Sequence, residues 1–437
     1  MGTPCGTGLN LGAWGMNIER RKILKSATLG AAALTVPTIL GSRAARAEGE
    51  IRVGVLYSLT GTTAIVEKSM SQVTLMAIDE INKAGGVLGK KVVPIVEDPA
   101  SDPRTFNEKA NKLVVGDQVP SVFGCYTSAS RKAVLPVFEQ FHNLLWYPTY
   151  YEGFECSKNV IYTGAVPNQQ LSNFVPWIIK TLGKKKFFII GSNYVYPREM
   201  SKVTRILLKQ HGGEWVADEY LPLGDAEWAA MVAKIKNSGC DVVFSNVVGD
   251  SVVAFYREYK NQGLSMDKLP ICATVTSEIE VAAMGPEFAV DSYTSFPYFE
   301  TVDNPQNHRF VEKYKSFAGK DAVTYHALEC SYFQVHLWAQ AIEKAGKADP
   351  MAIREAALGQ KYLAPEGPVK IEPQNQNTWL TPRIGQAQSD GMFKIVDAYK
   401  EPIMPLPYAA YGETPTNLFC TAHGLNIPKL RMALQKS

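Results

Sequence analysis

The chain has 437 residues, of which 46% are apolar and 20% charged, so it can bury the cores of two or three globular domains. Its formal net charge is +3, but residues 1–47 hold six of the Lys and Arg residues and only one acidic residue. The remainder carries 39 basic and 41 acidic residues, a net charge of −2. This balance removes the main electrostatic support for a nucleic-acid partner, so we expect none.

Residues 1–47 have the layout of an export signal. Arg20 and Arg21 precede a weakly apolar run, which resembles a twin-arginine leader, and residues 45–47 (Ala-Arg-Ala) offer the small side chains that a signal peptidase reads. The run is too short for a membrane span and is broken by Pro37. We therefore expect a cleaved signal, a periplasmic mature protein and no membrane insertion after cleavage.

Six cysteines follow this leader, and their spacing matches neither a CxxC motif nor a structural zinc site. Export would permit disulfides, but spacing alone does not pair these residues. The chain also lacks GxSxG, HExxH and P-loop motifs. We therefore expect no catalysis, no cofactor and no bound metal.

Strand and helix patterns alternate along the segment that follows the leader. Apolar runs rich in β-branched residues predict strands, and amphipathic runs that end at Gly predict helices. In the first half, strands are expected at 51–59, 91–97, 119–124 and 144–148, and helices at 67–85, 103–117 and 128–142. After residue 168, strands are expected at 186–192, 241–246 and 269–275, and helices at 171–183, 197–213, 228–237 and 250–263.

The alternation of apolar strands with helices predicts parallel sheets that are covered by helices on both faces. Residues 304–358 are expected to be mostly helical, and residues 361–399 to form short strands. The expected fold is α/β, with two doubly wound lobes and a ligand cleft between them. The expected boundaries are 48–167 with 301–361 for lobe one, 168–300 with 362–411 for lobe two, and 412–437 for a tail of unknown role.

Four loops are expected at the carboxyl ends of the strands, which is where open parallel sheets bind ligands. All four contain Tyr, Ser or Thr; they are residues 124–130, 146–155, 191–199 and 273–280. Hydroxyl groups both donate and accept hydrogen bonds, and aromatic rings can hold a flat molecule between them. Few Lys or Arg residues lie nearby. This composition favours a flat, uncharged, polar ligand such as urea or a short amide.

The stretch WYPTYYEGFE (146–155) follows a predicted strand and is rich in phenols. If strand alternation continues past Pro148, Tyr147, Thr149 and Tyr151 share one side and Tyr150 lies on the other. We expect Tyr147 and Thr149 to hold the ligand through their hydroxyls, and Tyr150 to support the loop.

The string IRVGVLYSLTGTTA resembles the branched-chain-amino-acid type of periplasmic binding protein. The strings GCYTSASRKAVLPVFE, WYPTYYEGFECSKNVIYTGAVPNQ and GSNYVYPREM resemble the urea and short-chain-amide branch of that family. The resemblance covers about residues 51–408 and ends before the tail. It implies a type I periplasmic binding protein fold and ligand contacts from Tyr126, Ser128, Tyr147, Thr149, Tyr151, Tyr194, Tyr196, Thr276, Ser277 and Glu278.

The resemblance and the loop composition together favour an exported receptor that delivers urea or a short-chain amide to an ABC permease. A cytosolic amide sensor of similar fold is one alternative, and the leader argues against it. A receptor for branched-chain or other amino acids is a second alternative. Glu278 could pair with the ammonium group of an amino acid, but the phenol-rich loops favour an uncharged ligand.

Overall fold

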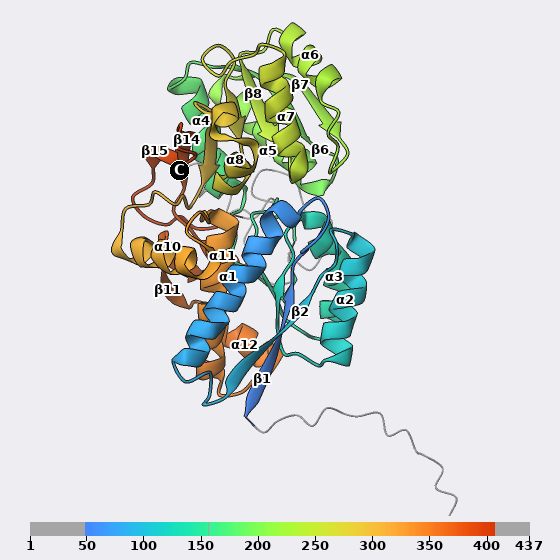
Figure 1. Ribbon diagram of the computed structural model, residues 1–437, viewed down its shortest axis with the longest axis vertical. Coiled ribbons are helices and arrows are strands. Elements are labelled where there is room, and N and C mark those ends of the chain that lie inside the picture. The colour runs from blue at the N-terminus through green and yellow to red at the C-terminus, as the bar shows by residue number, and fades with distance from the viewer. Residues whose placement is uncertain (1–48, 156, 407–437) are drawn as a thin grey trace, which may run out of the picture. The chain divides into compact units, whose positions relative to one another are not determined.

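The computed structural model describes residues 49–155 and 157–406 (Figure 1). The expected leader and tail lie outside these residues. The first sheet has five parallel strands in the order β2-β1-β3-β4-β5. Its strands are β1 (Glu50–Leu56), β2 (Lys91–Glu97), β3 (Val122–Gly124), β4 (Leu145–Tyr147) and β5 (Val160–Tyr162).

Helices cover both faces of the first sheet, as the alternating pattern predicts (Figure 1). α1 (Ala64–Lys83) packs against α11 (His326–Ala345) on one face, and α2 (Pro103–Asn111) packs against α3 (Ser128–Gln140) on the other. The remaining helices of this lobe are η1 (Lys112–Gly116), α10 (Pro305–Ala318) and α12 (Pro350–Ala357).

The second sheet has seven strands in the order β15-β14-β10-β9-β8-β6-β7. β14 pairs antiparallel with both β10 and β15, and the other pairs are parallel. The strands are β6 (Lys186–Ser192), β7 (Glu214–Leu221), β8 (Val242–Asn246), β9 (Ile271–Ala273), β10 (Tyr293–Phe296), β14 (Arg383–Ala387) and β15 (Phe393–Ala398). The helices of this lobe are α4 (Pro167–Lys180), α5 (Val195–His211), α6 (Ala229–Asn237), α7 (Asp250–Asn261), α8 (Glu278–Met284) and α9 (Pro286–Ala289).

Within residues 49–406, the chain crosses between the two lobes three times. It leaves the first sheet after β5, returns after β10, and joins the second sheet again at β14. Before that last crossing, β11 (Lys361–Ala364), β12 (Gly367–Ile371) and β13 (Thr378–Trp379) form a small antiparallel sheet. β11 packs against α11, and Asn377 bridges to Tyr162 of β5. These strands therefore lie with the first lobe, and the boundary expected at residue 361 falls within this lobe.

Side chains of the short central strands alternate between two apolar cores. Trp146 lies in the core beside Phe123 and α11, whereas Tyr147 lies in the core beneath α2 and α3. Both side chains are fully buried. Across the described ranges, no helix is long and apolar enough to span a membrane.

Candidate functional site

A small cavity lies where the loops of the two sheets meet. The space that atoms do not fill there is about 180 Å³, which includes open solvent, and the lining side chains lie too close together to admit a water molecule. The first lobe contributes residues from α1, from the loops after β3 and β4, and from the start of α11; the second contributes residues from α8 and the end of β10. The lining residues are Val66, Tyr126, Tyr150, Ser277, Glu280, Phe296, Tyr325, His326 and Ala327.

Tyr150 connects the two lobes at this cavity. Its hydroxyl lies 3.0 Å from the hydroxyl of Tyr126 in the first lobe. Its ring centre lies 5.5 Å from that of Tyr196 and 5.2 Å from that of Phe296, both in the second lobe. It also stacks on the ring of His326 at 6.3 Å. Contacts across the two lobes therefore meet at one aromatic side chain.

A tight turn after β3 directs Tyr126 into the cavity. Gly124 has no room for a side chain, because a Cβ there would lie 2.3 Å from the carbonyl oxygen of Leu56. Cys125 then adopts a left-handed backbone with φ of 66°, which is uncommon for a non-glycine residue. Thr127 caps α3 by accepting a hydrogen bond from the backbone N–H of Ser130 at 3.0 Å. The turn chemistry of this loop thus fixes Tyr126 between the sheet and the helix.

A fully buried ion cluster lies behind this loop. Arg131 pairs with Glu152 at 2.7 Å and with Glu155 at 2.9 Å. Ser128 donates to Glu152 at 2.6 Å and accepts from Arg131 at 3.0 Å. Burial opposes ionisation of Glu155, but the charges of Arg131 and Lys132 hold its pKa below the ordinary value. The guanidinium of Arg131 is therefore already paired with carboxylates of the protein.

This ion cluster determines how the residues of the second loop are oriented. The guanidinium of Arg131 lies 4.8 Å from the ring centre of Tyr147 and 4.5 Å from that of Tyr151. The Tyr147 hydroxyl donates to the backbone oxygen of Tyr126 at 2.7 Å, and the Tyr151 hydroxyl donates to Asn377 at 2.9 Å. Both rings lie in the core beneath α3.

Residues 147–151 therefore alternate in facing. Tyr147 and Tyr151 lie in the core beneath α3, whereas Tyr150 faces the other side, which lines the cavity. Thr149 is buried and lies 3.4 Å from the backbone oxygen of Cys125. Its backbone also lies against Gly164, where a Cβ would come within 2.1 Å of the Thr149 carbonyl carbon. Tyr150, which we expected only to support the loop, is the member that reaches the cavity. The guanidinium of Arg131 holds the rings of Tyr147 and Tyr151 on the α3 side, whereas Tyr150 lines this cavity.

The second lobe contributes Ser277 to the lining, as expected, but its carboxylate there is Glu280. Ser277 and Glu280 form a capping box, in which Glu280 accepts from the Ser277 hydroxyl at 2.6 Å and from its N–H at 2.9 Å. Glu278 lies elsewhere and accepts from the backbone N–H of Glu300 at 2.9 Å. Burial raises the pKa of Glu280 to about 7 and that of Glu278 to about 8.

The other residues expected from the second lobe lie around the cavity without lining it. The hydroxyl of Tyr196 donates to Thr274 at 3.2 Å, and its ring packs on Tyr150. Thr276 interacts with the Tyr256 hydroxyl at 3.2 Å. Tyr194 is half-buried at the start of α5, where burial and the nearby Tyr147 raise its pKa well above the ordinary value.

Sequence reasoning missed several lining residues, chiefly Glu280, Phe296, Tyr325 and His326. The pattern S-x-x-E at 277–280 is a readable capping box, and it would have placed Ser277 and Glu280 on the same side of the helix start. Tyr325 and His326 belong to a segment that returns to the first lobe after the second crossing, so no neighbouring motif indicated them.

A cavity between two doubly wound lobes, with loops of both lobes in its lining, is the architecture of a solute-binding protein. The chain belongs to the periplasmic binding protein domain family, whose pattern matches residues 51–414. The family consists of non-enzymatic solute receptors that work with ABC transporters, which agrees with the expectation that this chain is not an enzyme.

Curated relatives of this chain are named for amino acids. It is 25% identical over 354 residues to the Leu/Ile/Val-binding protein homolog 6 of Brucella suis, covering 79% of this chain and 90% of that protein. It is also 25% identical to an amino acid binding protein of Pseudomonas aeruginosa, covering 78% of this chain and 93% of the relative.

Solved structures confirm the type I periplasmic binding protein fold. A Rhodopseudomonas palustris solute-binding protein in complex with p-hydroxybenzoic acid matches with a TM-score of 0.74 at 22% identity, covering 81% of this chain and 98% of that chain. A branched-chain amino acid binding protein of Streptococcus pneumoniae in complex with isoleucine matches with a TM-score of 0.71 at 22% identity, covering 82% and 100%.

Proposed function

We propose that this protein is the exported, periplasmic receptor of an ABC importer, and that it binds urea or another short, uncharged amide between its two lobes. The receptor would then deliver the amide to the permease subunits. The observation that carries this proposal is the chemistry of the cavity lining. Among the described residues that line it there are hydroxyls, aromatic rings and one carboxyl group, but no Lys or Arg.

An anionic ligand would lack a cationic partner in this lining. Arg131, one turn into α3, is fully buried and pairs with both Glu152 and Glu155. Recruiting it to a ligand carboxylate would leave a buried carboxylate of the protein unpaired, which is costly. The lining therefore disfavours benzoate-like acids and gives the carboxylate of an amino acid no charged partner.

An uncharged amide matches the groups that are present. Glu280 offers an acceptor for N–H groups, and the hydroxyls of Tyr126 and Tyr150 can donate to a carbonyl oxygen. The rings of Tyr150, Phe296 and His326 form flat apolar surfaces beside these polar atoms.

The contacts of Tyr150 with Tyr196 and Phe296 also suggest how ligand binding is coupled to closure. These aromatic contacts join residues of the two lobes, so separating the lobes would expose them and open the cavity. A ligand that bridges the first lobe and Glu280 would favour the closed arrangement. Such hinge closure is a usual mode of domain motion around a ligand.

The names of the curated relatives support a second candidate, a receptor for branched-chain or other amino acids. A thermal-shift panel separates the candidates, because a ligand at 100 times its Kd raises the free energy of unfolding by about 2.7 kcal/mol. We expect urea, formamide or acetamide to raise the melting temperature, and leucine and 4-hydroxybenzoate to leave it unchanged. Stabilisation by leucine or 4-hydroxybenzoate, with no response to any amide, would overturn the proposal.

A further inference from the structure

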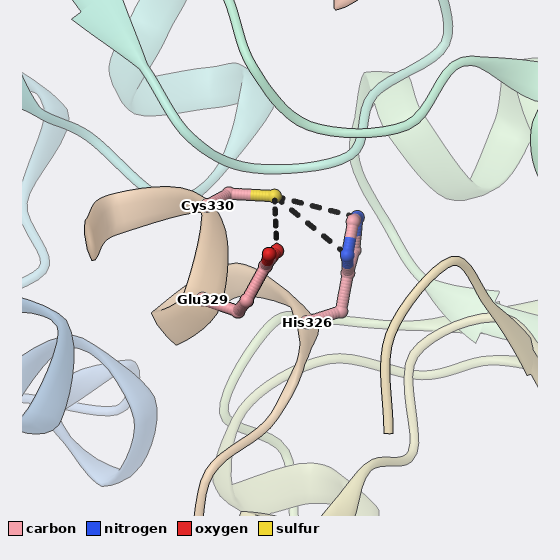
Figure 2. A group of neighbouring side chains, drawn as sticks. All are labelled: His326, Glu329 and Cys330. Atoms are coloured by element: carbon pink, nitrogen blue, oxygen red, sulfur yellow. Dashed lines mark hydrogen bonds between the residues drawn. The ribbon is translucent and has the colours of Figure 1, made fainter. Parts of the chain in front are cut away.

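Three potential metal ligands lie on the first turn of α11, at positions i, i+3 and i+4. These residues are His326, Glu329 and Cys330, and their spacing places them on one face of the helix. All three are fully buried, and one donor atom from each lies within 4.8 Å of the others. Figure 2 shows the imidazole, carboxylate and thiol converging on one point.

The sulfur–nitrogen distances in this cluster are close to those expected around a shared zinc ion. The sulfur of Cys330 lies 3.6 Å from Nδ1 and 3.8 Å from Nε2 of His326, and 3.8 Å from Oε2 of Glu329. With Zn–S of about 2.3 Å and Zn–N of about 2.0–2.1 Å, tetrahedral geometry places sulfur and nitrogen about 3.6 Å apart. Both ring nitrogens lie near the sulfur.

A backbone N–H group orients the carboxylate of Glu329, and a nearby carboxyl oxygen of Glu366 has no hydrogen-bond partner. Oε1 of Glu329 accepts from the backbone N–H of Glu366 at 3.2 Å, which leaves Oε2 beside the thiol. The carboxyl of Glu366 is buried too, and its Oε2 has no hydrogen-bond partner. Arg383 donates to the backbone oxygens of Glu366 and Thr381. Two buried carboxyl groups thus lie near one guanidinium.

The cluster also lies beside the interlobe cavity. His326 and Ala327 line the interlobe cavity, so a cation can reach the imidazole when the lobes separate. Neutral imidazole is the form that ligates metals, and Cys with His is a donor set that zinc accepts.

We propose that His326, Glu329 and Cys330 bind one thiophilic divalent cation, such as Zn²⁺, which enters through the interlobe cavity. The imidazole binds through a nitrogen lone pair. The thiol and the carboxyl group each release a proton to solvent as they coordinate, so the bound site is electrically neutral and two protons are released per ion. Three protein donors leave the fourth position of a tetrahedral ion for water. This inference does not depend on the identity of the organic ligand.

Cobalt(II) provides a spectroscopic probe, because a cobalt–thiolate bond gives a charge-transfer band in the near ultraviolet. We expect one equivalent of Co²⁺ to produce this band in the reduced full-length protein, and one equivalent of Zn²⁺ to remove it. Cys330→Ser should abolish the band and Glu329→Gln should weaken cobalt binding at least about tenfold, the range seen when metal-site partners are removed. Cys272→Ala, which removes another buried thiol, should leave the band unchanged.

Thermal melting followed by circular dichroism, without metal, shows whether each variant folds. Loss of the cobalt band can then be distinguished from loss of folding. If Cys330→Ser melts like the parent protein but lacks the band, the site is supported. A parent protein that gives no thiolate band with excess Co²⁺, or a Cys330→Ser protein that gives the same band, would overturn the proposal. A band lost equally in Cys272→Ala would also overturn it, since the responding thiol would lie elsewhere.

Discussion

Glu280 and Glu278 occupy the same first turn of α8 but have different surroundings, so they form a matched pair of variants. Glu280 lines the cavity and accepts from the hydroxyl and N–H of Ser277. Glu278 accepts from the backbone N–H of Glu300. We predict that Glu280→Gln weakens amide binding and that Glu278→Gln does not.

The expected magnitude follows from the hydrogen bonds at each position. A hydrogen bond to a charged group contributes about 1.5–3 kcal/mol, so losing the ionised acceptor of Glu280 should lower affinity about 10- to 150-fold. Burial raises the pKa of Glu278 to about 8, so this carboxyl is mostly protonated near neutral pH. Gln replaces it with a neutral group of similar shape, and affinity should change less than about threefold.

The pH dependence provides a second signature of Glu280. Burial raises its pKa to about 7, against the hydrogen bonds from Ser277. Because the ionised form is the better acceptor, amide affinity should rise between about pH 6 and pH 8 in the parent protein and stay flat in Glu280→Gln. The pH dependence of folding stability has the opposite sign. The unfolded state releases this proton near pH 4.5, so the contribution of Glu280 to stability falls as pH rises from about 4.5 to about 7.

Isothermal titration calorimetry on the parent and both variants, at several pH values, decides the matter. The ligand is whichever of urea, formamide and acetamide gives the largest thermal shift. If Glu278→Gln loses more affinity than Glu280→Gln, or if both bind like the parent, the cavity beside α8 is not the amide site.

Four further predictions concern other parts of the molecule. Tyr150→Phe removes the hydroxyl that lies 3.0 Å from the hydroxyl of Tyr126. Calorimetry should show the affinity for the amide falling about 5- to 150-fold. An unchanged Kd would show that Tyr150 does not contact the ligand. Arg131→Met should lower the free energy of unfolding, measured in urea, by about 3–5 kcal/mol, because two buried carboxylates lose their partner. Lys132→Met, which changes an exposed side chain, should lower it by less than about 1 kcal/mol. Equal losses in the two variants would show that the buried ion cluster does not stabilise the fold. Replacing Arg20 and Arg21 by Lys should leave uncleaved precursor in the cytoplasm, and normal processing would refute twin-arginine export. Small-angle scattering should show a smaller radius of gyration with ligand, and an unchanged radius at saturation would argue against hinge closure.

The fold was predictable because its signals are local. Apolar runs and amphipathic segments indicate each strand and helix, and their alternation leaves parallel sheets covered by helices as the compact solution. The position of β11–β13 was not readable in this way, because short strands between turns carry no mark of the lobe they join. Their place depends on contacts with α11 and with Tyr162, far away in the sequence.

The loops around the candidate site were predictable from the sequence, but the side chains of those loops that face the cavity were not. Strand alternation separated Tyr147 from Tyr150 correctly, yet it could not say which side lines the cavity. That choice depends on Arg131, which is buried with two carboxylates and holds the ring of Tyr147 beneath α3. A basic residue one turn into a helix is usually exposed, so the burial of Arg131 was hidden from sequence reasoning.

A crystal structure of the mature protein with the tightest-binding short amide tests the central claim most directly. We predict electron density for one amide in the interlobe cavity, with an N–H group donating to Glu280 and the carbonyl oxygen near the hydroxyls of Tyr126 and Tyr150. Density for the amide anywhere else, or a cavity occupied by an amino acid whose carboxylate displaces a partner of Arg131, would contradict the account.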